Sequence, residues 1–256
     1  MSQKPMSKTI HRALLSCAVL AGFAFGQTAA AQAGSAADTA EARPDFSGVW
    51  LPNSKESGRW PQERPFTPAM AELQAQWTKA TAPINFERDD EHTSCLPYVL
   101  PYLTTTITQY PFEIVTTPRR IYIFTEVYGQ VRRIDMDDTH VSPETLPTRV
   151  GTSRGRWEGS QLVVETTHIL PQNEGTRYPG SPSLRVTERF SLVEGGEFGK
   201  QLVDEITFTD PLVYKEPITI RMVYKPARGV EVGEYICNED IWDQHRDGAT
   251  SKIPWR

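Results

Sequence analysis

Two carboxylates occupy apolar positions in strand-like stretches of the sequence. Apolar and polar residues alternate over 184–192 and again over 202–208, and Glu188 and Asp204 fall on the apolar series. Because successive side chains of a strand point to opposite faces, both carboxylates are expected to face a protein interior. If the connecting turn is symmetric about Gly196, Glu188 lies directly opposite Asp204 on the neighbouring strand.

A pair of inward carboxylates is suited to acid–base chemistry. Two such groups cannot both ionise cheaply, so one keeps a proton or an arginine lies between them. Environments that separate two acids in this way create a general acid and a general base. We therefore take Glu188 and Asp204 as candidate catalytic residues, with Tyr122 as a third. The alternative is a structural ion pair of Glu188 with Arg132 or Arg133, and a slip of one residue in register would change the face.

Aromatic residues form a second candidate site, for ligand binding. Phe124 shares a strand face with Tyr122, Trp157 stands at a predicted turn, and Tyr224 belongs to a late strand. Aromatic linings suit flat or apolar ligands. Arg156, next to Trp157 and two residues from Arg154, would add a site for an anionic group. The alternatives are a purely structural aromatic core and a solvated arginine turn.

Metal and cofactor signatures do not emerge from the chain. The sequence contains neither a nucleotide-binding fingerprint nor a metalloprotease or nucleophile-elbow motif. Asp135–Asp138 lacks the glycine and the final glutamate of a calcium loop. Beyond residue 33 the histidines are far apart in sequence: His92, His140, His168 and His245. We predict no metal and no organic cofactor.

The N-terminal residues have the organisation of a secretory signal peptide. Basic residues, the last of them Arg12, precede an uncharged apolar run over 13–25, and Ala31–Ala33 offers a cleavage site. We expect residues 1–33 to be removed and the protein to work in the periplasm or outside the cell. Removal takes away three basic and no acidic residues, so the formal net charge of −5 becomes three units more negative. Such acidity argues against nucleic acid and anionic membranes as partners, and no later segment is apolar enough to span a membrane.

Two cysteines, Cys95 and Cys237, remain after that cleavage. In an oxidising compartment we favour a disulfide between them over two buried thiols or a metal site. The long loop that the bond closes would contribute up to about 4–5 kcal/mol through the entropy of the unfolded chain.

The predicted elements are almost all strands. Thr67 and Pro68 have the types of an N-cap and a first helical residue, and they open one helix over 68–80. Period-2 alternation and short connections predict a mainly β, single-domain antiparallel barrel of calycin-like type, with a β-sandwich as the alternative. We assign 34–66 to a leader and loop and 67–256 to the barrel domain, with longer loops over 137–155 and 167–182 bordering the barrel mouth. The predicted strands are 45–50, 112–116, 120–126, 131–136, a hairpin over 156–165, 184–192, 202–208, 218–225 and 232–237.

The chain resembles a large group of secreted, mostly uncharacterised proteins of sphingomonads and acidobacteria. The resemblance covers nearly all of the chain after the signal peptide and implies secretion without naming an activity. The motifs that carry it are Pro44–Trp50, Cys95 with Pro97, Pro111–Val115, Val131–Ile134, Gly155–Gly159, Leu162–Thr166, Glu188–Phe190 and Glu234–Glu239.

This chain departs from the group at polar positions. The group usually has histidine at position 152, His-Ser-Glu at 180–182 and histidine at 185, where this chain has Thr152, Gly180-Ser181-Pro182 and Arg185. The residues that match the group, such as Trp157 and Glu188-Arg189, are of types that suit structural roles. The departures therefore argue against a function common to this chain and the group.

Three functions follow as expectations. The first is a periplasmic barrel that accommodates a small apolar or aromatic molecule. The second is a cofactor-independent lyase, isomerase or hydrolase that uses carboxylate or tyrosine acid–base chemistry on such a molecule. The third is an envelope interaction module. An enzyme requires a deep pocket with a strongly perturbed titratable group, whereas a carrier requires an apolar cavity.

Overall fold

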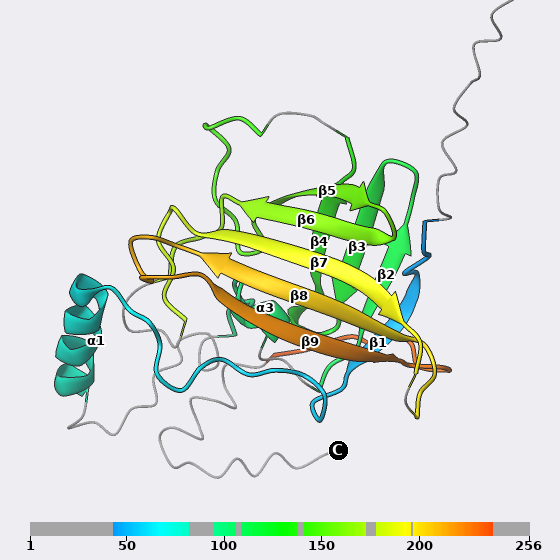
Figure 1. Cartoon of the computed structure of the whole chain (residues 1–256), viewed down its shortest axis with the longest axis horizontal. Helices are drawn as coiled ribbons and strands as arrows, with labels where there is room; N and C mark the ends of the chain where they lie inside the picture. Colours follow the sequence, from blue (N-terminus) through cyan, green and yellow to red (C-terminus); the bar gives the residue numbers. More distant parts are fainter. Residues whose placement is uncertain are drawn as a thin grey trace, which may run out of the picture. The chain divides into compact units, whose positions relative to one another are not determined.

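The protein folds into a closed barrel of nine strands in sequence order, β1 to β9 (Figure 1). The computed structural model describes residues 43–81, 95–105, 109–137, 141–172, 178–195 and 197–237. The predicted barrel is confirmed and the sandwich alternative is wrong, because β1 pairs with both β2 and β9 and so closes the sheet. The strands are β1 Gly48–Pro52, β2 Phe112–Thr116, β3 Arg120–Thr125, β4 Gln130–Asp135, β5 Thr152–Glu158, β6 Gln161–Thr167, β7 Arg185–Val193, β8 Gln201–Thr209 and β9 Ile218–Pro226.

One neighbouring pair of strands is parallel. β4 and β5 pair in parallel, with Ile134 beside Ser153 and Asp135 beside Arg154, whereas every other pair is antiparallel. The strict antiparallel expectation is therefore wrong at this pair. The reason is geometric: directions cannot alternate all the way around a closed ring with an odd number of strands. The chain must return along the barrel between β4 and β5, and residues 136–151, here called the crossover, make that connection.

The predicted helix is confirmed as α1, Pro68–Thr81. Thr67 caps it, because its Oγ1 accepts a hydrogen bond from the backbone N–H of Met70 at 3.3 Å. The same residue joins the helix to the loop after β8, since the backbone N–H of Thr67 donates to the carbonyl of Val213 at 2.9 Å.

A second helical segment closes one end of the barrel. Residues 98–105, here called the plug, include the short helix α3, Tyr102–Thr105, which the sequence analysis did not predict. Leu100 is fully buried, and the side chain of Gln130 donates to the backbone carbonyl of Tyr98 at 2.7 Å. The rings of Tyr102 and Tyr178 lie 5.3 Å apart, so aromatic packing fills this end.

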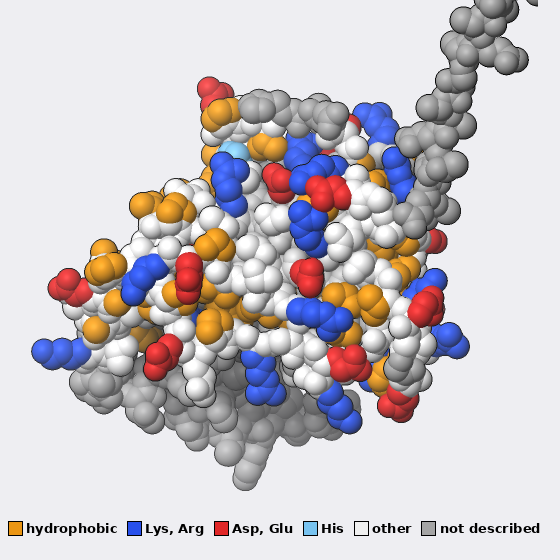
Figure 2. Space-filling model, viewed as in Figure 1, with side chains coloured by type: hydrophobic (Ala, Val, Ile, Leu, Met, Phe, Trp, Pro, Cys, Tyr) orange, Lys and Arg blue, Asp and Glu red, His pale blue; other side chains and the backbone are white. Residues whose placement is uncertain are grey.

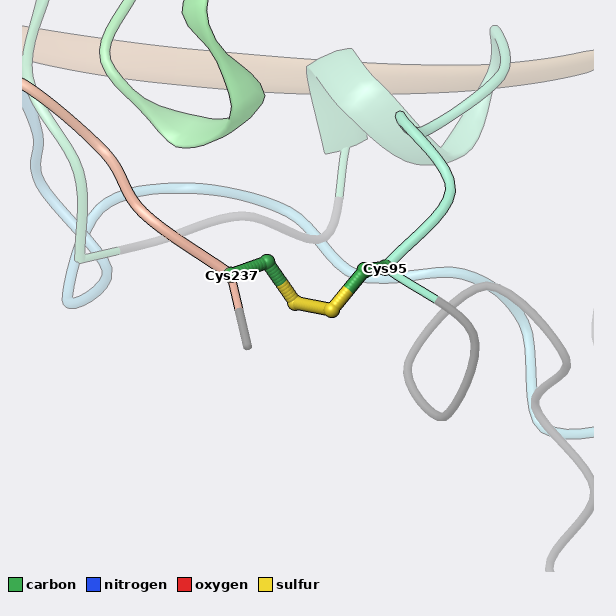
Figure 3. Close-up of a disulfide and its surroundings, with 2 residues drawn as sticks. All are labelled: Cys95 and Cys237. Carbon is green, nitrogen blue, oxygen red and sulfur yellow. A yellow bond between two sulfur atoms is a disulfide. The ribbon is translucent and has the colours of Figure 1, made fainter. Parts of the chain in front are cut away.

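The disulfide Cys95–Cys237 is confirmed, with the two Cα atoms 5.6 Å apart. Figure 3 shows that it ties the segment leading into α3 to the chain that follows β9. Two expectations are corrected here. Residues 232–237 are not a strand, because β1 already occupies the edge of β9 where another strand would pair. Because β1 (Gly48–Pro52) is a strand of the barrel, the barrel begins before residue 67, where the predicted domain boundary lay.

Among the residues described, no helix has the length and apolar character needed to cross a membrane.

Candidate functional site

An ion pair is buried at the centre of the barrel. Arg132 on β4 and Glu188 on β7 are 2 % and 0 % exposed, and two hydrogen bonds of 2.8 and 2.5 Å join their side chains. Arg132 Nη2 also lies 3.4 Å from Ser153 Oγ and 3.3 Å from Thr166 Oγ1. Burial is the largest single effect and acts to lower the pKa of Arg132, but the charge and hydrogen bonds of Glu188 and the charges of Asp204 and Tyr224 together outweigh it, so the pKa is raised. Arg132 thus stays charged, and the sequence-based ion-pair interpretation of Glu188 fits this geometry.

Asp204 on β8 is the second buried carboxylate, but not at the predicted register. Glu188 pairs with Ile206 and Phe190 pairs with Asp204, so the two acids are diagonal rather than opposite. The shift is two residues, which preserves the inward face of both. Burial, and then the nearby charge of Glu188, raise the pKa of Asp204 well above its usual value, although Arg132 opposes the shift. A carboxyl group in this position retains its proton more readily than an exposed aspartate.

Tyr224 on β9 borders the same group. Its hydroxyl donates to the backbone carbonyl of Thr104 in the plug at 3.3 Å. Burial and the charges of Asp204 and Glu188 raise the pKa of Tyr224 well above its usual value. Tyr224, predicted from the sequence to be a ligand-binding residue, lies beside the buried carboxylates and not in a separate aromatic site.

The space next to these residues is small. A cavity of about 40 Å³ is lined by Arg132, Glu188, Asp204 and Tyr224 together with Leu103 and Thr104 of the plug. Drug-sized ligands require pockets of about 300–1,000 Å³, whereas a single water needs about 10–15 Å³. Asp204 Oδ1 and Arg132 Nε are buried and lack partners among the described residues. The barrel interior is therefore a packed core with a water-sized cavity, in which the polar side chains of Arg132, Glu188, Asp204 and Tyr224 meet apolar ones such as Phe112 and Phe190.

Tyr122 and Phe124 lie on the outer face of β3. The residues between and beside them, Ile121 and Ile123, are buried in the barrel core, and the rings of Tyr122 and Phe124 stack on each other at 6.0 Å. Alternation along the strand places them away from Arg132, Glu188 and Asp204. The structure therefore does not bring Tyr122 or Phe124 to the carboxylates.

The crossover forms a larger cleft on the outside of the barrel. The cleft has a volume of about 930 Å³ and lies between crossover residues 141–147 and the outward side chains of β5, β6 and the start of β7. The two loops predicted to border the barrel mouth thus border this outer cleft. Leu146, whose surface is 80 % exposed, stands in its wall. The other apolar lining residues are Val141, Pro143, Pro147, Ile169, Pro182 and Leu184.

Three arginines line this cleft. Arg154 is paired with Asp135 at 3.0 Å, and Arg156 is paired with Glu165 at 2.7 Å. Arg185 is exposed and has no carboxylate partner among the described residues. Figure 2 shows the resulting mixture of basic and acidic side chains over β5 and β6. One cation in the cleft is thus available to an anionic ligand.

Trp157 belongs to a different surface from the cleft. Its ring stacks on Phe46 at 5.5 Å, and the Arg43 guanidinium lies 5.9 Å from the ring centroid. Of the predicted ligand-binding residues, Arg156 alone lines the cleft, and Trp157 packs against the end of the barrel.

Sequence reasoning missed the cleft as a site, although one signal pointed to it. Thr152, Pro182 and Arg185, the positions at which a departure from the resembling group is expected from the sequence, all line the cleft. His168 lines it too, and its Nδ1 lies 2.9 Å from Thr167 Oγ1. The other histidines beyond residue 33, namely His92, His140 and His245, lie outside the described residues.

Within the described ranges, no group of three or more His, Cys, Asp or Glu side chains is placed to hold a metal ion.

Comparison with known proteins does not assign the chain to a family. No protein-family model matches the sequence, and no curated protein is similar to it.

Proposed function

We propose that this protein binds a small molecule with an apolar or aromatic body and an anionic group, and that it does so in the outer cleft. The observation that carries the proposal is the combination of a ligand-sized, partly apolar cleft with Arg185, a cation that forms no ion pair with a described carboxylate. An apolar body would cover exposed side chains such as Leu146. The anionic group would accept charge-assisted hydrogen bonds from the Arg185 guanidinium.

Two further observations support this proposal. The interior cavity of about 40 Å³ is too small for an aromatic molecule, which favours a site outside the barrel. The positions that differ from the resembling group, Thr152 and Arg185 among them, line the cleft, as expected if this chain takes a ligand of its own.

We place this binding in the periplasm or the extracellular space. The predicted signal peptide over residues 1–33 and the Cys95–Cys237 disulfide support that location.

Binding of 8-anilino-1-naphthalenesulfonate tests the proposal, because this fluorescent probe combines an aromatic body with a sulfonate. We expect saturable binding to the folded chain, and Arg185→Gln should weaken it about 10-fold, the usual value of a charge-assisted hydrogen bond. Arg133→Gln is the matched control, since Arg133 is exposed on β4 and does not line the cleft. Equal affinities of wild type, Arg185→Gln and Arg133→Gln would reject the cleft as the site.

A cofactor-free enzyme is the second candidate function. The raised pKa of Asp204 beside Glu188 favours it, because a carboxyl group that retains its proton can act as a general acid. The reaction would require the plug to move so that a substrate reaches the cavity. For an enzyme of this kind, Asp204→Asn should abolish turnover of the substrate in the interior cavity. Arg185→Gln should leave that turnover unchanged, because Arg185 does not line the interior cavity.

A further inference from the structure

A second recess lies next to the plug, away from the crossover. It has a volume of about 440 Å³ and is lined by Ser54, residues 57–62, Arg64, Thr105 and Tyr178. The two charged residues in its lining are Arg59 and Arg64, and no acidic residue lines it. In a chain with a formal net charge of −5, this is a local excess of positive charge.

Arg64 is held in place by aromatic rings. Its guanidinium carbon lies 5.7 Å from the Trp60 ring centroid and 5.1 Å from that of Tyr178. Both distances fall within the range of a cation–π contact. Trp60 is itself fixed, because its ring stacks on the core residue Phe208 at 4.9 Å and its indole N–H donates to Thr105 Oγ1 at 2.8 Å. The guanidinium therefore rests on a rigid platform.

The terminal nitrogens of Arg64 remain available. Within the described residues the side chain of Arg64 makes no hydrogen bond and no ion pair, and its Nε is buried without a partner. Neither Arg59 nor Arg64 has a carboxylate partner in the part of the chain that the structure describes. A guanidinium that stacks through its faces keeps its N–H edge free, and this edge matches the oxygens of phosphate and carboxylate groups.

We propose that this recess binds the oxyanion group of a small acid, with Arg64 as the fixed donor and Arg59 as the second cation. The contact between protein and ligand would be made by the terminal N–H groups of both arginines. Little reorganisation accompanies binding, because the ring platform already orients Arg64. This site is separate from the outer cleft and does not depend on it.

Titration with inorganic phosphate, followed by two-dimensional NMR of the indole N–H groups, tests the proposal. Trp60 is one of 6 tryptophans, and Trp60→Phe identifies its signal. We expect phosphate to shift that signal saturably, beyond the effect of chloride at equal ionic strength. A parallel titration with acetate distinguishes a tetrahedral from a planar anion, and saturable binding of either supports the site.

Variants locate the anion. Arg64→Gln and Arg59→Gln should each weaken binding about 10-fold, while Arg64→Lys, which keeps the charge but loses the planar edge, should fall between them and wild type. Arg133→Gln and Arg185→Gln should bind as wild type does. If Arg64→Gln fails to fold, Arg59→Gln, at an exposed position, decides the outcome. Wild-type shifts no larger than those of chloride, unchanged binding in both glutamine variants, or loss in Arg185→Gln would each overturn the proposal.

Discussion

The guanidinium of Arg132 is a full charge in the buried interior of the barrel. Its stability in that place depends on the bidentate contact with Glu188 and on the hydroxyls of Ser153 and Thr166. Taking two charges out of water costs several kcal/mol per ion, and their attraction repays this cost when the geometry is good. Removal of one partner is therefore far more damaging than replacement of both.

Glu188→Gln should lower the free energy of unfolding by about 3–5 kcal/mol, because it leaves Arg132 buried without a counter-ion. Urea denaturation at neutral pH measures the effect. Arg189→Gln is a suitable control: the neighbouring Arg189 makes a surface ion pair with Glu158, and such pairs contribute about 0–1 kcal/mol. Equal decreases in the free energy of unfolding for Glu188→Gln and Arg189→Gln would show that the buried ion pair contributes no more to stability than a surface ion pair.

Asp204 gives stability a pH dependence. Its pKa is raised in the folded chain above the value of about 3.9 in an unfolded chain, so the folded protein binds more protons. The contribution of Asp204 to the free energy of unfolding is thus fully present below the pKa of the unfolded chain. It is lost as the pH rises through the raised pKa of the folded chain. Glu188, Arg132 and Tyr224 face it and shape this titration.

Asp204→Asn removes this titration while keeping the shape of the side chain. Unfolding free energies of variant and wild type, measured between about pH 4 and pH 8, should shift in favour of the variant as the pH rises. Parallel pH profiles for the two proteins would contradict the raised pKa.

Alternation along β7 and β8 was enough to predict that Glu188 and Asp204 face inward. It was not enough to fix their register, because a shift of two residues leaves every side chain on the same face. Alternation also separated Tyr122 and Phe124 from Ile121 and Ile123. It could not say which set faces the core, since both sets are apolar enough to be buried and only strand pairing decides.

At the scale of elements, the parallel pairing of β4 and β5 requires the long crossover, and residues of that crossover form one wall of the outer cleft. Hydrophobic patterns describe each strand by itself and do not encode the direction of its neighbour, so this pair could not be predicted from the sequence. The plug was missed for a similar reason: α3 has four residues, too few to show a helical period.

Gly155 allows β4 and β5 to approach each other. A Cβ atom at this position would lie 2.5 Å from Met136 Sδ and 2.8 Å from Ile134 Cγ2. Gly155→Ala should therefore lower the free energy of unfolding by about 1–3 kcal/mol, the typical cost of overpacking. In a Met136→Ala background the added methyl group meets fewer atoms, and thermal or urea unfolding should show a smaller loss. An equal loss in both backgrounds would mean that the contact with Met136 is not the cause.

At the scale of the whole molecule, the disulfide joins the entry of the plug to the chain beyond β9. Cys95 and Cys237 are 142 residues apart in sequence, and breaking the bond releases a loop that includes most of the barrel. Cys237→Ser should lower the free energy of unfolding by up to about 4–5 kcal/mol.

Three variants check this prediction by chemical denaturation. Cys95→Ser, Cys237→Ser and the double variant should lose the same stability, because all three remove one shared bond. Reductant should bring the wild type to their level and leave the variants unchanged. Additive losses in the double variant would instead indicate that each cysteine packs independently of the bond.

The crossover differs from the other connections of the barrel in what limits its length. A hairpin loop sets the register of the two strands that it joins, so insertions there disturb pairing. The crossover joins parallel neighbours and must reach from one end of the barrel to the other, and its fixed contacts include Thr148, which bridges to Ile169, and Arg149, whose carbonyl accepts a hydrogen bond from the backbone N–H of Leu100. Its exposed stretch around Leu146 can therefore gain or lose residues without changing strand pairing. Because this stretch is one wall of the cleft, changes in its length would reshape the proposed binding site while the strand pairing of the barrel stays the same.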